Sequence, residues 1–257
     1  MQITHDLSVG GLQQVLVNLG KSIDKEHFQI CILCLRALGP LSKEMEKLGI
    51  KVMLLPQKKR GVDYLSFLKV AKIIRQEQPE IIHTHNTQPL VDGTLGALIS
   101  GCRPRIIHTD HAREFPDKRR YMFAEWLMSH FVFKMVGVSE QTTENLRVFE
   151  KIPRRKLLTI ENGIDQSRFV GTVDKGVKKK ELGVSERDPV IGVISRIEKV
   201  KGISYLLQAM PPILKDQPTL KLLIVGDGAE KNSLQQESYK LGIHSNVIFT
   251  GMRNDVP

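Results

Sequence analysis

Aromatic residues and cysteines are both scarce in this sequence. Aromatics make up 5% of the 257 residues, and most of them stand in apolar stretches with helical spacing. Nucleic-acid binding needs aromatics on an exposed sheet or a recognition helix, so we expect no nucleic-acid partner. The three cysteines are too few for a disulfide framework. Cys31 and Cys34 stand three residues apart on a predicted strand, where they point to opposite faces and do not share a metal ion.

Long apolar runs and paired carboxylates are missing as well. No uninterrupted apolar stretch reaches the length of a membrane span, and the first residues lack the basic region and apolar core of a signal peptide. We therefore expect a cytoplasmic protein. There is no Asp-x-Asp motif to hold a metal ion against a diphosphate, so we expect no metal. Gly226-x-Gly228 lacks the third glycine of a dinucleotide fingerprint, which argues against a nicotinamide cofactor.

Positive charge is in excess. The chain has 38 Lys and Arg against 28 Asp and Glu, a net charge of +10, which favours polyanions, anionic lipid surfaces or phosphorylated small molecules. The segment 118–136 joins basic residues to five aromatics. One interpretation is a helix packed on a sheet, and the other is peripheral contact with an anionic membrane at its cytoplasmic face. The aromatics are Tyr121, Phe123, Trp126, Phe131 and Phe133.

The spacing of apolar residues predicts strands that alternate with helices over residues 1–165, which is the pattern of a doubly wound α/β domain. The predicted strands are 2–5, 28–35, 50–55, 81–85, 105–109, 134–138 and 157–160. The first predicted helix begins at Leu12, and the others cover 41–48, 64–76, 89–100, 119–133 and 141–149.

A second α/β pattern follows at 189–257, after a region at 166–188 that has no clear apolar period and that we interpret as a linker. Three strands and two helices make a small core, so we expect this domain to be incomplete and the chain to be truncated at its C-terminus. The predicted strands are 190–194, 221–225 and 247–249, and the helices begin at Gly202 and lie within 230–241.

The stretch 190–202 predicts a strand, a cationic loop and a helix in that order. Its β-branched residues predict a buried strand at 190–194, and Arg196, Lys199 and Lys201 follow. The carboxyl end of a parallel strand and the N-terminus of a helix both favour an anion, and Arg with Lys suits a diphosphate. The alternative is a solvated basic loop, because the glycines of a phosphate loop are absent.

A glycine pair follows the first predicted strand. Gly10 and Gly11 would let a ligand approach the backbone, and the helix that follows would present free N–H groups. The alternative is a simple tight turn.

Four histidines lie near the ends of two predicted strands. His83 and His85 share one strand face, and His108 and His111 flank the end of the next strand. Their spacing disfavours a zinc site. We expect His111 to line a cleft at its strand end, and the alternative is that these are hydrogen-bonded loop histidines.

Taken together, these segments resemble the retaining glycosyltransferases of family 4, group 1, over nearly the whole chain. That resemblance implies the GT-B architecture of two facing Rossmann-like domains, with an acceptor-side domain at 1–165 and a partial nucleotide-sugar donor domain at 189–257. The matching segments are SVGGLQQVLVNL at 8–19, IIHTHN at 81–86, HTDHAR at 108–113, VSEQTTENL at 138–146, IENGID at 160–165, ISRIEKVKG at 194–202, LLIVGDGAEK at 222–231 and VIFTGMRNDV at 247–256.

The resemblance also implies a role for each candidate residue of the second domain. Arg196 and Lys201 would be catalytic residues that grip the donor diphosphate. Met252 and Arg253 stand where similar proteins offer backbone to the nucleobase. The nucleotide-diphosphate sugar would be the co-substrate, and no metal would take part.

In the first domain, the resemblance implies that Gly10 and Gly11 approach the donor phosphates and that His111 lies near the transferred sugar as a catalytic residue. The activity implied is that of a retaining hexosyltransferase acting on a glycan, lipid-linked or small-molecule acceptor, as in polysaccharide biosynthesis. The family's glutamate segment, E-x7-E, is absent from this sequence. The alternative is therefore a truncated, catalytically inactive remnant with at most weak nucleotide binding.

Overall fold

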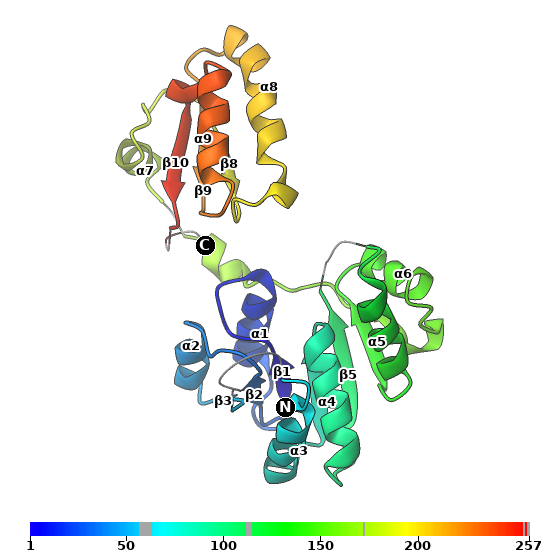
Figure 1. The fold of residues 1–257 in the computed structure, drawn as a ribbon. Coiled ribbons are helices and arrows are strands. Elements are labelled where there is room, and N and C mark those ends of the chain that lie inside the picture. The colour runs from blue at the N-terminus through cyan, green and yellow to red at the C-terminus, as the bar shows by residue number, and fades with distance from the viewer. Residues whose placement is uncertain (57–62, 112–114, 172, 254, 256–257) are drawn as a thin grey trace. The chain divides into compact units, whose positions relative to one another are not determined.

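The computed structural model describes all residues except 57–62, 112–114, 172, 254 and 256–257. The chain forms two compact units, Met1–Asp165 and Gln166–Pro257 (Figure 1). Each unit consists of a parallel sheet with helices packed on it. The predicted α/β fold class is therefore confirmed.

The first unit contains a seven-stranded parallel sheet in the order β3, β2, β1, β4, β5, β6, β7. The strands are β1 (Gln2–Thr4), β2 (Cys31–Cys34), β3 (Lys51–Leu54), β4 (Ile81–His85), β5 (Arg105–Asp110), β6 (Lys134–Gly137) and β7 (Leu157–Thr159). The helices are α1 (Gly11–Ser22), α2 (Ser42–Lys47), α3 (Ser66–Glu77), α4 (Thr87–Ile99), α5 (Arg119–Ser129) and α6 (Glu140–Val148), with a short 3-10 helix η1 (Arg154–Lys156).

Helices cover both faces of this sheet. Successive side chains of a strand point to opposite faces, and neighbouring apolar residues of β2 pack against different helices. Ile32 of β2 belongs to a buried cluster with Leu16 of α1. The next residue, Leu33, belongs to a different cluster that contains Val70 of α3 and Leu90 of α4. The sheet thus lies between two apolar layers, as a doubly wound fold requires.

The second unit has a three-stranded parallel sheet in the order β10, β9, β8. Its apolar core lies where α8 and α9 pack on the sheet, and it includes Leu207, Met210, Leu222 and Ile224. The strands are β8 (Val190–Ile194), β9 (Lys221–Val225) and β10 (Val247–Gly251). The helices are α7 (Lys175–Glu181), α8 (Ile203–Asp216) and α9 (Lys231–Lys240), with 3-10 helices η2 (Gln166–Phe169), η3 (Lys199–Lys201) and η4 (His244–Asn246).

The prediction that the strand at 190–194 is buried is wrong. Val190, Ile191 and Ile194 are 39%, 37% and 62% exposed. The physical reason is the position of β8, which pairs with β9 on one side, while no strand within the described residues pairs with its other side. The apolar pattern is correct for a strand, but this strand lies at an edge.

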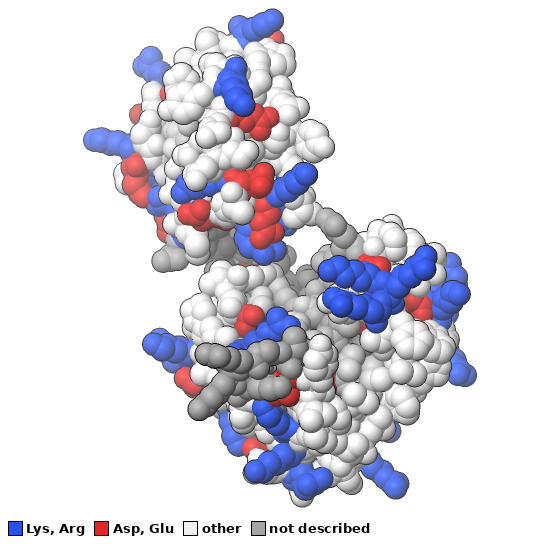
Figure 2. Space-filling model, viewed as in Figure 1, with Lys and Arg blue, Asp and Glu red and all other residues white. Residues whose placement is uncertain are grey.

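Within the described residues, no helix is long and apolar enough to cross a membrane. Basic side chains gather over the part of the first unit that carries α5 and α6 (Figure 2). Lys118, Arg119 and Arg120, at the start of α5, are all exposed.

Candidate functional site

The cationic loop of the second unit joins β8 to α8. Arg196 has a 68% exposed side chain, and its Nη1 forms an ion pair of 2.9 Å with Oε1 of Glu198. Lys201 is exposed at the end of η3. Gly202 is the N-cap of α8 in the left-handed region, with φ of 65°, and it supplies no side-chain cap to the helix. The two predicted cations therefore stand on one loop before an uncapped helix N-terminus, which suits an anion.

The loop between β9 and α9 packs closely against the cationic loop at two glycines. A Cβ on Gly226 would lie 1.9 Å from the carbonyl oxygen of Ser195, and a Cβ on Gly228 would lie 2.3 Å from that of Ile197. The backbone N–H of Ile197 donates to the carbonyl of Asp227 at 2.9 Å. The pair that resembled part of a dinucleotide fingerprint thus lets two backbones pack together.

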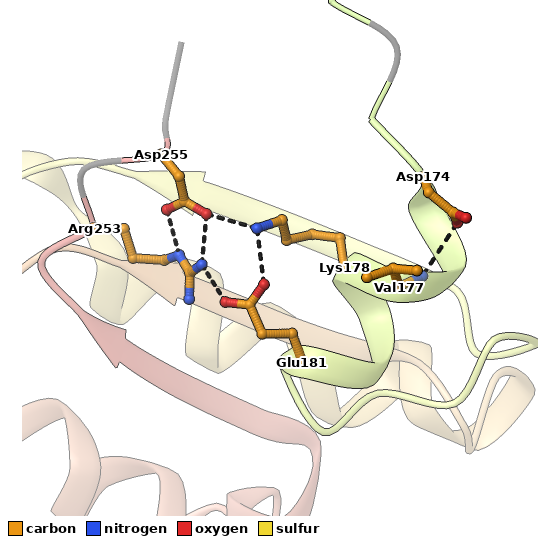
Figure 3. Close-up of polar contacts among 6 residues, drawn as sticks. All are labelled: Asp174, Val177, Lys178, Glu181, Arg253 and Asp255. Carbon is orange, nitrogen blue, oxygen red and sulfur yellow. Dashed lines mark hydrogen bonds and ion pairs between the residues drawn. The ribbon is translucent and has the colours of Figure 1, made fainter.

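Arg253 lies just after β10, and its side chain is occupied by ion pairs (Figure 3). Its guanidinium donates to Oδ1 of Asp255 at 2.8 Å and to Oδ2 at 2.6 Å, and also to Glu181 of α7. Lys178 of α7 donates to Asp255 at 2.6 Å and to Glu181 at 2.8 Å. Hydrogen bonds from Arg253 and Lys178 lower the pKa of the Asp255 carboxyl. Met252, next to this network, is 68% exposed.

The helix α7 that carries two members of this network was missed in the sequence, because it lies where no apolar period is present. A local signal was available. The Oδ1 atom of Asp174 accepts a hydrogen bond from the backbone N–H group of Gly176 at 2.8 Å. It also accepts one from the backbone N–H group of Val177 at 3.2 Å, which Figure 3 shows. Aspartate at this position is a strong N-cap, and it predicts a helix start without any apolar stripe.

In the first unit, the glycine pair is the beginning of α1. Gly10 is its N-cap with extended backbone and no side-chain cap, and Gly11 is its first residue. Asp6 orders the segment before the helix, since its Oδ1 accepts from the backbone N–H of Ser8 at 2.9 Å and from Nε2 of Gln13 at 3.1 Å. The first N–H groups of α1 therefore follow the carboxyl end of β1 without a side-chain cap, as an anion site requires.

His111 follows the carboxyl end of β5 and belongs to a histidine cluster. Its Nε2 lies 3.1 Å from Nδ1 of His85, and the rings of His85 and His83 are 4.3 Å apart between centroids. Nε2 of His83 bonds to the hydroxyl of Thr109 at 2.7 Å. Burial lowers the pKa of His111 to about 4 and that of His83 to about 3, and it holds the pKa of His85 well below 6.5. All three imidazoles are therefore neutral at pH 7.

The fourth histidine lies apart from this cluster. His108 is fully buried, and its Nδ1 bonds to the hydroxyl of Thr84 at 2.9 Å. With Asp110 and Glu125 it forms a buried group whose possible ligand atoms lie within 4.8 Å of one another. Each of the three residues also takes part in a further interaction. The structure thus separates His108 from the other three histidines. Within the described residues, the group of His108, Asp110 and Glu125 has a spacing that could hold a cation.

Asn86 also lies at the carboxyl end of the strands in the first unit, and its unusual backbone was not predicted from the sequence. It stands between β4 and α4 with φ of 68° and ψ of 168°, a region that is nearly reserved for glycine. Backbone conformation of this kind leaves no signal in apolar periodicity, although asparagine between a strand and a helix is consistent with it.

Within each unit, the candidate residues lie at one sheet edge. Gly10, Gly11 and His111 follow the carboxyl ends of β1 and β5 in the first unit, and Arg196, Lys201, Met252 and Arg253 follow those of β8 and β10 in the second. In parallel α/β sheets this is the edge where ligands bind.

The family comparisons match both units. The model described as Glycosyltransferase Family 4 matches residues 9–168, and the model described as Glycosyl transferases group 1 matches residues 174–257.

Individual relatives are longer than this chain. UDP-Gal:alpha-D-GlcNAc-diphosphoundecaprenol alpha-1,3-galactosyltransferase of Escherichia coli is 24% identical, over 97% of this chain and 67% of its own length. Alpha-monoglucosyldiacylglycerol synthase of Streptococcus pneumoniae is 30% identical, over 76% of this chain and 47% of its own length. The crystal structure of Anabaena HepE in complex with UDP-glucose has the same fold, with a TM-score of 0.82 at 20% identity, over 99% of this chain and 69% of HepE.

Proposed function

Because the chain belongs to glycosyltransferase family 4, we propose that it moves a sugar from a nucleotide-diphosphate sugar to a glycan, lipid-linked or small-molecule acceptor, with retention of the anomeric configuration. The observation that carries this proposal is the cationic loop before α8. Arg196 and Lys201 stand there before a helix N-terminus that has no side-chain cap. Such a site favours the charge that grows on a diphosphate as it leaves.

In the second unit, Arg196 and Lys201 hold the donor diphosphate. Arginine supplies a planar fork and lysine a point charge, so the two cations neutralise the leaving group without a metal ion. The backbone of Met252 and Arg253 faces the nucleobase, and no cofactor besides the donor takes part. The ion pairs of the Arg253 side chain support this assignment, since they leave the backbone of the segment as its means of binding.

In the first unit, the N–H groups at Gly10 and Gly11 bind phosphate oxygens, and His111 contacts the transferred sugar. The uncapped start of α1 supports the first assignment. Neutral His111 supports the second, because an uncharged imidazole exchanges hydrogen bonds with sugar hydroxyls.

The test is nucleotide binding by the 257-residue chain, measured as a thermal shift and by calorimetry with UDP, GDP, ADP and their sugars. Ligand at a hundred times its dissociation constant stabilises a competent site by about 2.7 kcal/mol. Arg196→Ala or Lys201→Ala should each cost about 1.5–3 kcal/mol of diphosphate affinity. Lys215→Ala removes an exposed lysine near the other end of α8 and is the matched control.

Two outcomes contradict the proposal. Unchanged dissociation constants for both variants reject Arg196 and Lys201 as the diphosphate anchors. Absence of any nucleotide effect on the wild-type chain favours the alternative, an inactive relative with at most weak nucleotide binding.

We also propose peripheral contact with an anionic membrane at its cytoplasmic face. The observation that favours this is that α5 exposes an aromatic side chain and buries a charged one. Phe123 is 61% exposed, while Glu125 is completely buried. Phe131 and Phe133, just beyond the helix, are 49% and 54% exposed. Basic residues gather over the same region (Figure 2). Exposed aromatics beside Lys and Arg suit an anionic lipid surface.

Flotation with phosphatidylglycerol and phosphatidylcholine vesicles tests this contact. We expect binding to the anionic vesicles alone, weakened by salt and about tenfold weaker in Phe123→Ala. Tyr205→Ala changes an aromatic of the second unit that is 78% exposed, and it should leave binding unchanged. Equal binding to both vesicle types, or none to either, would reject the membrane contact.

A further inference from the structure

A row of buried polar side chains crosses three neighbouring strands of the first unit. Gln2 belongs to β1, His85 to β4, and His111 follows β5, and these strands are adjacent in the sheet. Gln2 is 8% exposed and His85 is 2% exposed. Polar groups buried to this degree need hydrogen-bond partners, so the contacts in this row can be followed atom by atom.

The first contact assigns the proton of His85. Its Nε2 lies 2.8 Å from Oε1 of Gln2. A carbonyl oxygen accepts hydrogen bonds and has no proton to donate, so Nε2 of His85 is the donor. A neutral imidazole carries one proton, which leaves Nδ1 of His85 with a lone pair.

The second contact then assigns the proton of His111. Nδ1 of His85 lies 3.1 Å from Nε2 of His111. Because Nδ1 of His85 accepts, Nε2 of His111 donates, and Nδ1 of His111 is left with a lone pair. Among the described residues, Nδ1 of His111 has no hydrogen-bond partner, and the side chain is half-buried.

We propose that Gln2 and His85 are positioning residues that fix His111 in its Nε2–H tautomer, so that Nδ1 of His111 accepts a hydrogen bond from a hydroxyl of the transferred sugar. This inference rests on the proposed function. A lone pair selects a hydroxyl donor and would repel the oxygens of a phosphate, so the arrangement assigns His111 to the sugar and not to the diphosphate. Desolvation lowers the pKa of both His85 and His111, which is consistent with neutral rings.

The test is the nitrogen NMR spectrum of the 257-residue chain with 15N-labelled histidine, read through two-bond proton–nitrogen correlations. We expect a protonated Nε2 and an unprotonated Nδ1 for both His85 and His111 at pH 7. Gln2→Met removes the acceptor at similar size, and it should give His111 a mixture of tautomers. His83→Gln replaces the ring next to His85 but removes neither hydrogen bond of the row, and it should leave the pattern of the other two histidines intact.

Binding measurements separate this inference from the proposed function. In Gln2→Met we expect the affinity for UDP-glucose or UDP-galactose, relative to UDP, to fall about three- to tenfold, while UDP affinity itself stays the same. A protonated Nδ1 on His111, an imidazolium, or a pattern that Gln2→Met does not change would overturn the inference. The wild-type spectrum decides the tautomer even where Gln2→Met does not fold. The expected spectrum in a chain that binds no nucleotide would support the tautomer and reject the proposed function.

Discussion

The first strands of the two sheets have opposite surroundings. β1 pairs with β2 on one side and β4 on the other, and its three residues are buried. β8 pairs with β9, and four of its five residues are exposed. Both strands contain β-branched residues, which favour a strand, while burial depends on neighbours contributed by distant parts of the chain.

The two units also differ in how they hold polar groups together. The first unit buries neutral histidines beside its central strands. The second uses exposed ion pairs between Lys178, Glu181, Arg253 and Asp255. Buried neutral groups respond to acid, and exposed ion pairs respond to salt, so the two units should fail under different conditions.

The largest expected effect is a fall in the free energy of unfolding of the first unit in acid. Burial lowers the pKa of His5 and His111 to about 4 and that of His83 to about 3. The unfolded chain binds these protons near pH 6.5, before the folded chain does, so the stabilisation is present above pH 6.5 and is lost as the pH falls toward 4. Each such histidine lowers the free energy of unfolding by about 1.4 kcal/mol per pH unit in this window.

Urea unfolding followed by the fluorescence of Trp126, the single tryptophan of the sequence, measures this effect in the first unit. We expect the midpoint to fall between pH 6.5 and 4.5. His83→Gln should make that dependence shallower by about 1.4 kcal/mol per pH unit. His244→Gln lies in the second unit and should leave it unchanged. A midpoint independent of pH would contradict the burial of neutral histidines.

The next largest effect is a difference in stability between two isoleucine variants. Ile3 and Ile191 are the second residues of β1 and β8. Ile3 is 0% exposed in β1, and Ile191 is 37% exposed in β8. Ile3→Ala should cost about 2–5 kcal/mol, because it leaves a cavity between β1 and the helices. Ile191→Ala should cost under about 1 kcal/mol. Urea unfolding by circular dichroism measures both, and similar costs would mean that β8 is covered in solution.

A smaller effect is expected in the loops that follow β8 and β9. Gly226 has φ of 138°, and a side chain there would meet the carbonyl of Ser195. Gly226→Ala should therefore destabilise the second unit by about 1–3 kcal/mol and weaken nucleotide binding by displacing the cationic loop. Gly192→Ala is the control, because no atom lies within 4 Å of the added methyl group. Equal behaviour of the two variants would reject the close packing of these loops.

The smallest effect concerns the exposed ion pairs. Glu181→Gln removes a partner of both Lys178 and Arg253, and it should speed hydrogen exchange in α7 at low salt. The difference from wild type should vanish in 1 M salt, where charges are screened over roughly 3 Å. Lys180→Gln changes an exposed lysine of the same helix and serves as the control. A difference that persists in high salt would show that Glu181 acts through something other than its charge.

Local sequence patterns predicted most of the elements. The strands at 81–85, 190–194 and 221–225 were predicted at their observed bounds, because runs of apolar, β-branched residues mark them. The family was also evident from its ordered motifs, and the family models confirm it. The helix α7 was missed, since it has no apolar stripe and depends on the Asp174 cap.

Sequence patterns indicate the candidate residues but not the partners that these residues contact in the structure. His85 bonds to Gln2, 83 residues away, and Arg253 to Glu181, 72 residues away. Residues so distant come together when the sheet assembles, and one sequence carries no sign of such pairs. The tautomer of His111 depends on these contacts and therefore needs the structure.

The glycines at 226 and 228 also determine which substitutions the cationic loop can accept without a change of its backbone path. Main-chain atoms hold its course, through Ser195 N to Val225 O, Ile197 N to Asp227 O and Glu230 N to Ile197 O. The side chain of Arg196 has no part in these bonds. A side chain on this loop can thus be exchanged while the path of the backbone is kept, so a substitution at Arg196 changes the charge that the loop presents and leaves its framework in place.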